Sequence, residues 1–320
     1  MRGNSVPEFD IISIGECMVE LYSDRPLADS EKFNKSYGGD TISVLVAASR
    51  LGSRTGYITR VGEDPFAPYL LQSWLDEIID ISLVRITPGR KNGIYFISAF
   101  EGGGSELSYY REGSAAATLS VDDLETEYLS AAKYLHISGV SQAVSDSCRR
   151  TVYEASRLVK ENKTGLVSYS PHLKFGLWSV DEAKIAFHEV LPYIDILFIE
   201  YPSESRDLNG DTSPEALIRA LWQQGIRIAV LKLEDRSCIA GERHSGVIGE
   251  VEAFSAGKVV DETGASDIFT GAFLHGLARG FDIFQAARLG NIMAGLKLTG
   301  RGSIASMPSH DDVYRVFEAA

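Results

Sequence analysis

The sequence has few of the features expected of a secreted, membrane-spanning or nucleic-acid-binding protein. Its 320 residues contain only three cysteines, Cys17, Cys148 and Cys238, a scattered and odd-numbered set that predicts a reducing, cytoplasmic compartment. No apolar run approaches the roughly 18 residues that a membrane helix needs, and the first ten residues lack the apolar core of a secretion signal. Positive charge is also scarce, since 31 Lys and Arg stand against 44 Asp and Glu, for a net charge of −13. We therefore expect neither nucleic acid nor a membrane as a partner.

Several catalytic and cofactor motifs are missing as well. The chain has no G-x-x-x-x-G-K-[ST] loop and no strand followed by G-x-G-x-x-G, which excludes the standard P-loop and the dinucleotide fingerprint. It has no H-E-x-x-H and no paired C-x-x-C, and its six histidines show no metal-binding spacing. A negative net charge still permits an anionic substrate, because a small pocket can be locally positive.

Short apolar runs alternate with amphipathic stretches almost from end to end. This alternation predicts a mostly parallel sheet with helices on both sides, whose ligands bind at the carboxyl ends of the strands. The expected strands are Ile11–Gly15, Thr55–Arg60, Lys133–Ser138, Thr164–Ser168, Asp195–Ile199 and Arg227–Leu233. The expected helices are Thr41–Leu51, Asp146–Glu161, Pro214–Gln224, Ser266–Arg279 and Ile283–Leu298.

One region does not follow this alternation of strands and helices. Two β-like runs, Gly93–Phe100 and Leu107–Arg111, are joined by the glycine-rich Glu101–Glu106, with no room for a helix between them. We read them as a hairpin. It is either a small β-lid over a cleft or an edge hairpin of the main sheet, and periodicity does not separate the two.

The most informative stretch for chemistry is DETGASDIFTGAFLHG, residues 261–276. Gly264, Ala265 and Ser266 come directly before a helical apolar pattern, so their backbone N–H groups could hold a phosphate or an oxyanion. Asp267 would lie in the first helical turn, where a carboxylate can accept a hydroxyl proton while the amides steady a transferred phosphoryl group. Taken alone, however, such an aspartate is more often a simple helix cap.

Two further segments could bind a polar ligand. Gly39 and Asp40, in Tyr37-Gly-Gly-Asp, open a predicted helix, and the carboxylate could accept hydrogen bonds from vicinal hydroxyls, although Gly-Gly-Asp is also ordinary turn chemistry. Tyr109 and Arg111 face the same side of their strand, with Tyr95 on the partner strand, and together could bind a carboxylate and hydroxyls. An arginine stacked on aromatic neighbours at a surface is the alternative.

Taken in order, these segments resemble the ribokinase/PfkB family of carbohydrate kinases, from about Ile11 to Pro308. The landmarks are IISIGE at residues 11–16, YGGD followed by a helix ending in ASRLG, and TRVGEDPFAPYL at residues 59–70. The most specific is DETGASDIFTGAFLHGL, which is similar to the family signature D-T-x-G-A-G-D-x-F-x-x-G. Within the family the likeness is greatest to 2-keto-3-deoxygluconate kinases, through GIYFI, YYREGSAAATL and the Leu-Trp-Ser at residues 177–179.

The resemblance implies a fold, a reaction and a set of roles. The fold is a three-layer α/β/α domain with a mostly parallel central sheet, spanning residues 1–320, with lid strands at about 17–37 and 90–113 that commonly form a homodimer contact. The reaction is the ATP-dependent, Mg²⁺-assisted phosphorylation of a sugar or sugar-acid hydroxyl. Asp267 would be the base, and Gly264, Ala265 and Ser266 the anion hole. The implied substrate contacts are Gly39, Asp40, Tyr95, Tyr109, Arg111 and Lys174; the implied nucleotide contacts are His172, Lys232, Glu234, Ser237 and Asn291.

The resemblance also implies cation sites. Glu204 would assist Mg²⁺ indirectly, with Glu200 as a second candidate in the same segment, EYPSE. Asp261, with Thr263, would hold a monovalent cation such as K⁺, as the corresponding positions do in some relatives.

Several positions depart from the family pattern. Ser266 stands at a glycine of the signature; at a positive φ it would cost on the order of 1 kcal/mol, whereas in a helical conformation its hydroxyl could donate to phosphate. Ser170, His172 and Lys174 stand where the family has an aspartate, an asparagine and an arginine. Glu234 and Ser237 replace glycines of the nucleotide loop, and Ser43 replaces another asparagine.

Three functions are compatible with this pattern. The first is a kinase for a 2-keto-3-deoxygluconate-like sugar acid, favoured by two cations, Arg111 and Lys174, in the expected pocket. The second is a kinase for a neutral sugar such as fructose or a ribofuranoside. The third is a kinase-fold sugar or nucleotide sensor with little catalysis, suggested by the accumulated departures but opposed by the presence of Asp267.

Overall fold

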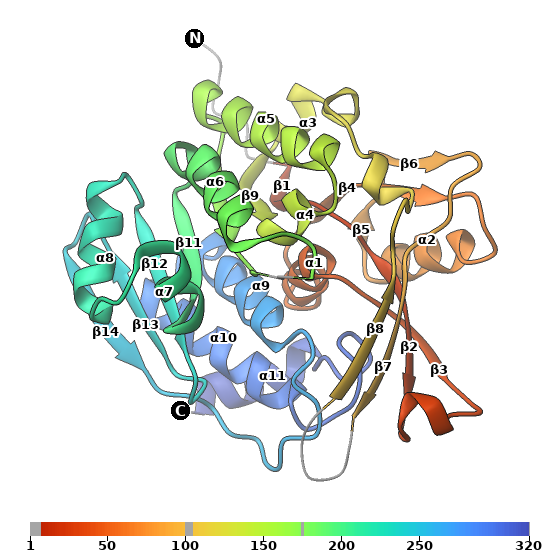
Figure 1. Ribbon diagram of the computed structural model, residues 1–320. Helices are drawn as coiled ribbons and strands as arrows, with labels where there is room; N and C mark the ends of the chain where they lie inside the picture. Colours follow the sequence, from red (N-terminus) through yellow and green to blue (C-terminus); the bar gives the residue numbers. More distant parts are fainter. Residues whose placement is uncertain (1–7, 100–104, 174–175, 320) are drawn as a thin grey trace.

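The computed structural model describes residues 8–99, 105–173 and 176–319 (Figure 1). Lys174, an expected substrate contact, lies outside these residues. Two sheets are present, one large and covered by helices, the other small and standing beside it.

The large sheet carries most of the chain. Its strands run in the order β14-β13-β12-β11-β10-β9-β1-β4-β5, with β6 also pairing with β4. All pairs from β12 to β5 are parallel, as is β4 with β6, and only the β12-β13-β14 edge is antiparallel. The bounds are β1 Phe9–Ile14, β4 Thr55–Gly62, β5 Ile79–Asp80, β6 Val84–Thr87, β9 Ala132–Ser138, β10 Leu166–Ser170, β11 Ile196–Tyr201, β12 Ile228–Leu233, β13 Cys238–Glu242 and β14 Val247–Val251.

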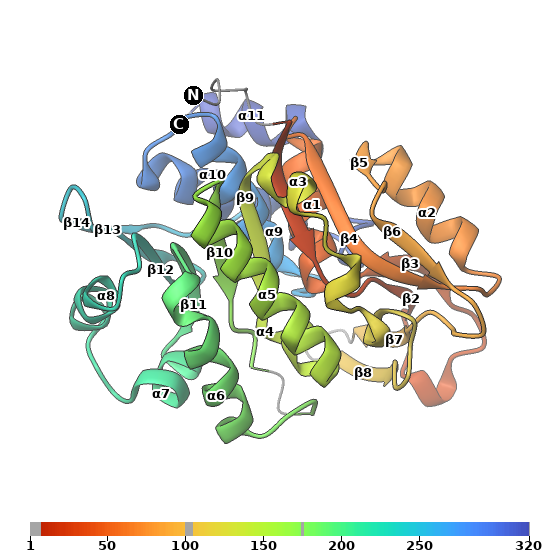
Figure 2. The same ribbon diagram turned by 90° about the horizontal axis from the view of Figure 1, so that it is seen from above.

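Helices cover both faces of this sheet, as Figure 2 shows for α5 and α6 on one side and α9 and α10 on the other. Alternating strand residues point into two separate cores, because successive side chains of a strand face opposite ways. Ile11 and Phe198 belong to the first core, whereas Ile12 and Leu197 belong to the second. The helices are α1 Asp40–Arg50, α2 Ala67–Asp76, α3 Thr126–Ser130, α4 Gly139–Ala143, α5 Asp146–Asn162, α6 Val180–Val190, α7 Ser203–Asn209, α8 Pro214–Gln223, α9 Ala265–Ala278, α10 Ile283–Lys297 and α11 His310–Ala319.

The small sheet, which we call the lid sheet, is built from two distant parts of the chain. Its order is β3-β2-β7-β8, with β2 Met18–Ser23, β3 Asn34–Gly38, β7 Ile94–Ala99 and β8 Ser105–Tyr110. β2 pairs with β3 and β7 with β8 in antiparallel fashion, while β2 and β7 run parallel. The expected hairpin is therefore part of a separate sheet and not an edge of the main one.

The three-layer α/β/α fold with a mostly parallel sheet is thus as predicted, and the element boundaries differ from the expected ones by at most a few residues. Strand β10 is the largest shift, since it begins at Leu166 and ends at Ser170, not at Ser168. The division of the chain into one domain with inserted lid strands stays a prediction.

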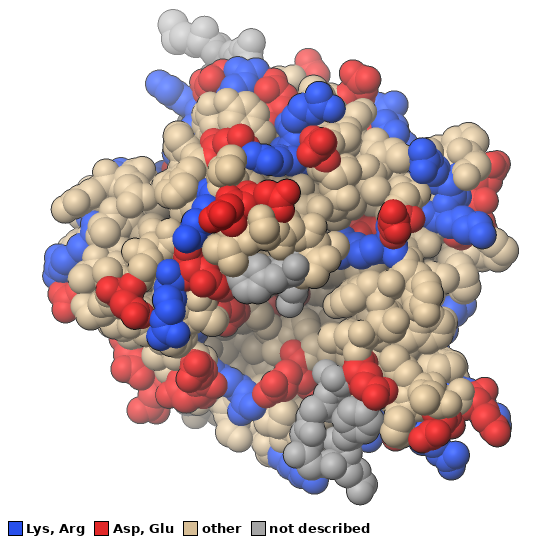
Figure 3. All heavy atoms as spheres, in the orientation of Figure 1, with Lys and Arg blue, Asp and Glu red and all other residues tan. Residues whose placement is uncertain are grey.

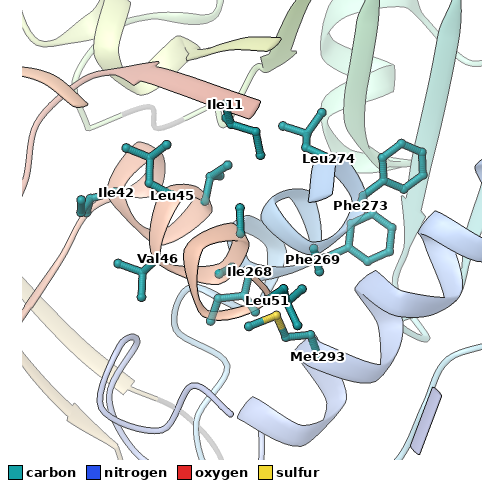
Figure 4. Packing of buried hydrophobic residues seen from close by; sticks show 14 of the residues in the cluster. Ile11, Ile42, Leu45, Val46, Leu51, Ile268, Phe269, Phe273, Leu274 and Met293 are labelled. Atoms are coloured by element: carbon teal, nitrogen blue, oxygen red, sulfur yellow. The ribbon is translucent and has the colours of Figure 1, made fainter. Parts of the chain in front are cut away.

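Helices α1 and α9 pack closely against each other in the first core (Figure 4). Ile42, Leu45 and Val46 of α1 belong to the same buried cluster as Ile268 and Phe269 of α9. Gly271 allows the close approach, because a Cβ there would lie less than 3.0 Å from the Val44 carbonyl oxygen and from the Ala47 Cβ. The contact brings the first turns of both helices to one place.

We therefore predict that Gly271→Ala destabilises the chain, although alanine is the better helix former. The added methyl group would press on the backbone of α1, and overpacking of this kind costs about 1–3 kcal/mol of unfolding free energy. Urea unfolding followed by circular dichroism measures the loss. Gly176→Ala is the matched control, since a Cβ there meets no atom within 4 Å; equal stability of the two variants would contradict the packing argument.

Candidate active site

The candidate site lies where the first turns of α1 and α9 meet the ends of the central strands. Asp40 is the first residue of α1, and Asp267 is the third residue of α9. His172 follows the carboxyl end of β10, Glu200 lies near the end of β11, and Lys232 near the end of β12. The structure thus brings together side chains from five elements at the strand ends, where parallel sheets bind ligands.

A glycine turn leads into α9. Gly264 is the N-cap with φ of 75°, a left-handed conformation that favours glycine, and a Cβ there would lie less than 3.0 Å from the Ser303 Oγ. The N–H groups of the first helical turn have no partner within the helix, and they lie at its positive end. Gly264, Ala265 and Ser266 thus lie at this end of α9, where the Ala265 N–H donates to the Glu262 carbonyl oxygen at 3.2 Å. Their role as an anion hole stays a prediction.

Asp267 is engaged by a histidine. The Nε2 atom of His172 lies 2.7 Å from Asp267 Oδ1, and both side chains are largely buried. Burial alone would lower the pKa of His172, but the charge of Asp267 and the hydrogen bond to it outweigh burial and raise the pKa. His172 was expected among the nucleotide contacts; the structure places it beside the expected base.

Asp40 faces the same space. Burial and the nearby negative charge of Asp267 raise the pKa of its carboxyl group, and His172 acts against this rise. Its buried Oδ2 atom has no hydrogen-bond partner. Because a buried, unpartnered carboxylate oxygen is costly, this atom is well suited to accept a hydrogen bond from a ligand hydroxyl.

Ser266 is helical and has no unfavourable φ, so the serine in place of glycine causes no backbone strain. Its hydroxyl donates to Glu200 Oε1 at 2.6 Å and accepts a hydrogen bond from Lys232 Nζ. Lys232 also forms an ion pair with Glu200 at 3.1 Å. Burial would raise the pKa of Glu200, but the Lys232 charge and the serine hydroxyl lower it.

Glu204 stabilises the backbone of this region. Its two carboxylate oxygens accept hydrogen bonds from the N–H groups of Leu173 and Glu200, at 2.9 and 3.0 Å. Both oxygens are thus engaged, which agrees with an indirect role and not with direct metal ligation. Across residues 8–99, 105–173 and 176–319, no three His, Cys, Asp or Glu side chains form a group that could hold a metal ion.

Protein atoms lie close to the two glycines before Asp40, so no open space faces them. A Cβ at Gly38 would lie less than 3.0 Å from the Tyr95 hydroxyl, and one at Gly39 equally close to the Glu16 carbonyl oxygen. Tyr95 is buried and donates a hydrogen bond to Glu20 Oε2. Burial raises the pKa of Glu20 to about 7, against the opposing hydrogen bond from Tyr95.

Arg111 follows β8 and points toward a carboxylate. Its Nη2 atom lies 2.5 Å from Glu16 Oε2, while the Ser114 hydroxyl donates to Glu16 Oε1 at 2.6 Å. The Nε atom of Arg111 is buried without a hydrogen-bond partner, which leaves this donor for a ligand. Tyr109, in contrast, is 50% exposed on the lid sheet.

The expected nucleotide contacts are spread over a wider area. Glu234 is exposed in the turn after β12, and Ser237 is buried and donates to Asp235 Oδ1 at 2.6 Å. Asn291, on α10, donates to the carbonyl oxygens of residues 251 and 252 and so fixes the end of β14. Only Lys232 and His172 of this set lie at the anion-hole turn.

Asp261 joins two loops. Its Oδ1 accepts from the Thr263 N–H at 2.9 Å and its Oδ2 from the Gly302 N–H at 2.8 Å. The ammonium group of Lys297, from the last turn of α10, donates to the Asp261 carbonyl oxygen at 2.7 Å and lies 3.9 Å from its Oδ1. The predicted cation position is thus already faced by a positive side chain.

Sequence reasoning missed Glu16, Glu20 and Lys297. Glu16 was visible in the IISIGE segment, and the expected pairing of an arginine with a carboxylate could have drawn attention to it. Glu20 and Lys297 gave no signal, because a glutamate in a strand and a lysine in a last helical turn are ordinarily exposed.

The molecular surface agrees with a site on this side of the molecule. Figure 3 shows the face of Figure 1 hollowed at its centre, with acidic and basic side chains around the hollow. Among the described residues, no helix is both long enough and apolar enough to span a membrane.

The chain is similar to known sugar kinases over nearly its whole length. The chain is 28% identical to a 2-dehydro-3-deoxygluconokinase from Thermoproteus tenax, covering 97% of this chain and 94% of that protein. It is 27% identical to fructokinase-1 from Zea mays, covering 97% and 98%. A structure of a ribokinase II from E. coli in complex with ATP and Mg²⁺ shares the fold, with a TM-score of 0.88 at 23% identity over 98% and 100% of the two chains.

The pattern of the pfkB family carbohydrate kinases matches residues 8–310, which is nearly the whole chain. Relatives that act on sugar acids and on fructose have similar identities to it. The resemblance found in the signature at residues 261–272 is therefore confirmed, and the chain belongs to the pfkB family and is a sugar kinase.

Proposed function

We propose that this kinase transfers the γ-phosphoryl group of ATP to a hydroxyl of a small sugar acid similar to 2-keto-3-deoxygluconate. One observation carries the proposal: the Asp267 carboxylate lies in the first turn of α9, directly after the Gly264 turn. A proton acceptor therefore lies at the positive end of a helix, where an attacking hydroxyl and a phosphoryl group can meet.

In this proposal Asp267 accepts the proton of the attacking hydroxyl, and Asp40 orients the sugar through its unpartnered Oδ2. The N–H groups at the start of α9 and the Lys232 ammonium group stabilise the charge on the transferred phosphoryl group. The lid sheet excludes water from the reacting atoms. Most of the catalytic effect is positioning, as expected for a loose transition state.

The residues present fit Mg²⁺ as a companion of ATP. This ion prefers to keep several waters and to bind substrate phosphates, so it needs few protein ligands. Glu200, with a side chain that is 34% exposed, would hold the hydrated ion through water, and Glu204 would position Glu200 through its backbone N–H. When bound, the ion neutralises charge on the phosphates.

We predict that Asp267→Asn reduces kcat by about two to four orders of magnitude, because the amide cannot accept the hydroxyl proton. Binding of substrate, measured by calorimetry, should change little. Asp282→Asn is the matched control: this exposed aspartate caps α10, and asparagine is an equally good cap. An unchanged kcat in Asp267→Asn would refute its assignment as the base.

The sugar-acid preference rests on Arg111, since Lys174 lies outside the described residues. The buried, unpartnered Nε donor of Arg111 suits a carboxylate oxygen of a ligand. One observation favours a neutral sugar instead: Glu16 already lies against this guanidinium and cancels its charge. Fructose is therefore the second candidate substrate class.

A substrate panel with coupled detection of ADP separates the two classes. We expect keto-deoxy sugar acids to have the highest kcat/KM, and Arg111→Gln to raise the KM for them about ten- to a hundredfold through loss of a charged hydrogen bond. Arg90→Gln is the control, because this arginine is exposed and its side chain donates to the Gly113 carbonyl oxygen. If neutral sugars are phosphorylated better, the fructose-like class is the correct one.

The His172–Asp267 pair predicts a pH dependence of stability. The pKa of His172 is raised above its usual 6.5 in the folded chain, so folding favours the protonated form. The contribution of protonated His172 to the unfolding free energy is fully present below about pH 6.5 and is lost as the pH rises through the raised pKa. His172→Asn should therefore cost more unfolding free energy at about pH 6 than at about pH 9.

Urea unfolding at both pH values measures this difference. His275→Asn is the control, because burial lowers the pKa of His275 to about 4, so that it is neutral throughout the range and its replacement should cost the same at both values. A cost of His172→Asn that is independent of pH would show that the histidine is not protonated beside Asp267.

The proposal includes a cytoplasmic homodimer. The cysteines of the chain are buried and free, as suits a reducing compartment. Leu107 and Tyr109 lie on the same face of β8 and are 45% and 50% exposed, and this apolar surface of the lid sheet supports the lid as the dimer contact.

A further inference from the structure

Asp261 is linked by a hydrogen bond to a loop that packs against the anion-hole turn. Through its Oδ2, Asp261 binds the Gly302 N–H, and the neighbouring Ser303 Oγ lies against Gly264. Ser303 also shares a hydrogen bond of 3.2 Å with Ser43 of α1. The turn before α9, the loop after α10 and the first turn of α1 are therefore one connected structure.

A negative charge lies at the centre of this structure. Asp261 is 7% exposed, and Glu20, from the lid sheet, lies near Gly302 and Ser303. Buried carboxylates need a positive partner, since an isolated buried charge is costly. A monovalent cation bound to Asp261 would supply that partner, and this is what the resemblance to the family predicts.

Lys297 lies beside Asp261 in this chain. Its side chain is 0% exposed, and its Nζ donates to the Asp261 carbonyl oxygen at 2.7 Å and lies 3.9 Å from Oδ1. Both carboxylate oxygens of Asp261 also accept a backbone hydrogen bond. A second positive charge at this point would meet the ammonium group and would find the oxygens of Asp261 already used, so a bound K⁺ does not fit the residues present.

We infer that the ammonium group of Lys297 replaces the monovalent cation, so that this kinase holds its anion-hole turn without K⁺. The inference rests on the proposed role of the Gly264–Asp267 turn for its effect on rate, but not for its effect on stability. Lys297 is a positioning residue, since it acts on the turn through Asp261.

The first test uses the unaltered chain. Both kcat and the melting temperature are measured in KCl, NaCl and tetramethylammonium chloride at equal ionic strength. We expect K⁺ to change kcat by less than about twofold, whereas coupling between an effector site and a catalytic site is typically about 5–150-fold. Activation by K⁺ of about fivefold or more, or a melting temperature raised by K⁺ alone, would overturn the inference.

The second test removes the ammonium group. Lys297→Ala leaves space beside Asp261, so we expect a lower melting temperature that K⁺ restores in part, while tetramethylammonium does not. Lys133→Ala is the matched control, because Lys133 forms an ion pair of 2.7 Å with Asp10 at another part of the sheet. An equal response of the two variants to K⁺ would overturn the inference.

The melting curves separate this inference from the proposed function. If no sugar is phosphorylated, the stability measurements on the unaltered chain still decide the role of Lys297. If Lys297→Ala does not fold, the response of the unaltered chain to K⁺ decides alone.

Discussion

Two carboxylates, Asp40 and Asp267, share one buried space at the start of two packed helices. Other groups of the site offset the repulsion between their negative charges. The pKa of Asp40 is raised by burial and by Asp267, while His172 lies against Asp267 and offsets part of the negative charge. The positive ends of α1 and α9 act in the same direction. Gly271 allows the two helices to approach closely enough for this pairing, so the core packing and the chemistry depend on the same contact.

The fold could be predicted from the sequence because its signals are local. Continuous apolar runs such as the one in β1 indicated strands covered on both faces, and the break in periodicity at residues 93–111 indicated the hairpin of the lid sheet. The anion-hole turn was visible for the same reason, since Gly264 and Asp267 are close in the sequence and their geometry follows from a helix start.

The partners of the site residues could not be predicted, because they come from distant segments. His172 and Asp267 are 95 positions apart by their numbers, and nothing near His172 indicates which carboxylate it meets. Arg111 follows the last strand of the lid sheet, as expected, but its partner Glu16 comes from the distant segment between β1 and β2. Lys297 looked like an ordinary lysine of a last helical turn, and only the tertiary structure buries it.

The parallel pairing of β2 with β7 has a consequence for motion over the site. These strands join two hairpins that are remote in the sequence. The four strands therefore move as one rigid unit, as long as the backbone hydrogen bonds between residues 19–23 and 94–98 are kept. Tyr95 and Glu20, which are hydrogen-bonded between β7 and β2, would move together, and Arg111 follows directly after β8, the last strand of this sheet in the sequence. Opening for a sugar would thus move Tyr95 and the Arg111 guanidinium together, so an arriving molecule would meet both groups or neither.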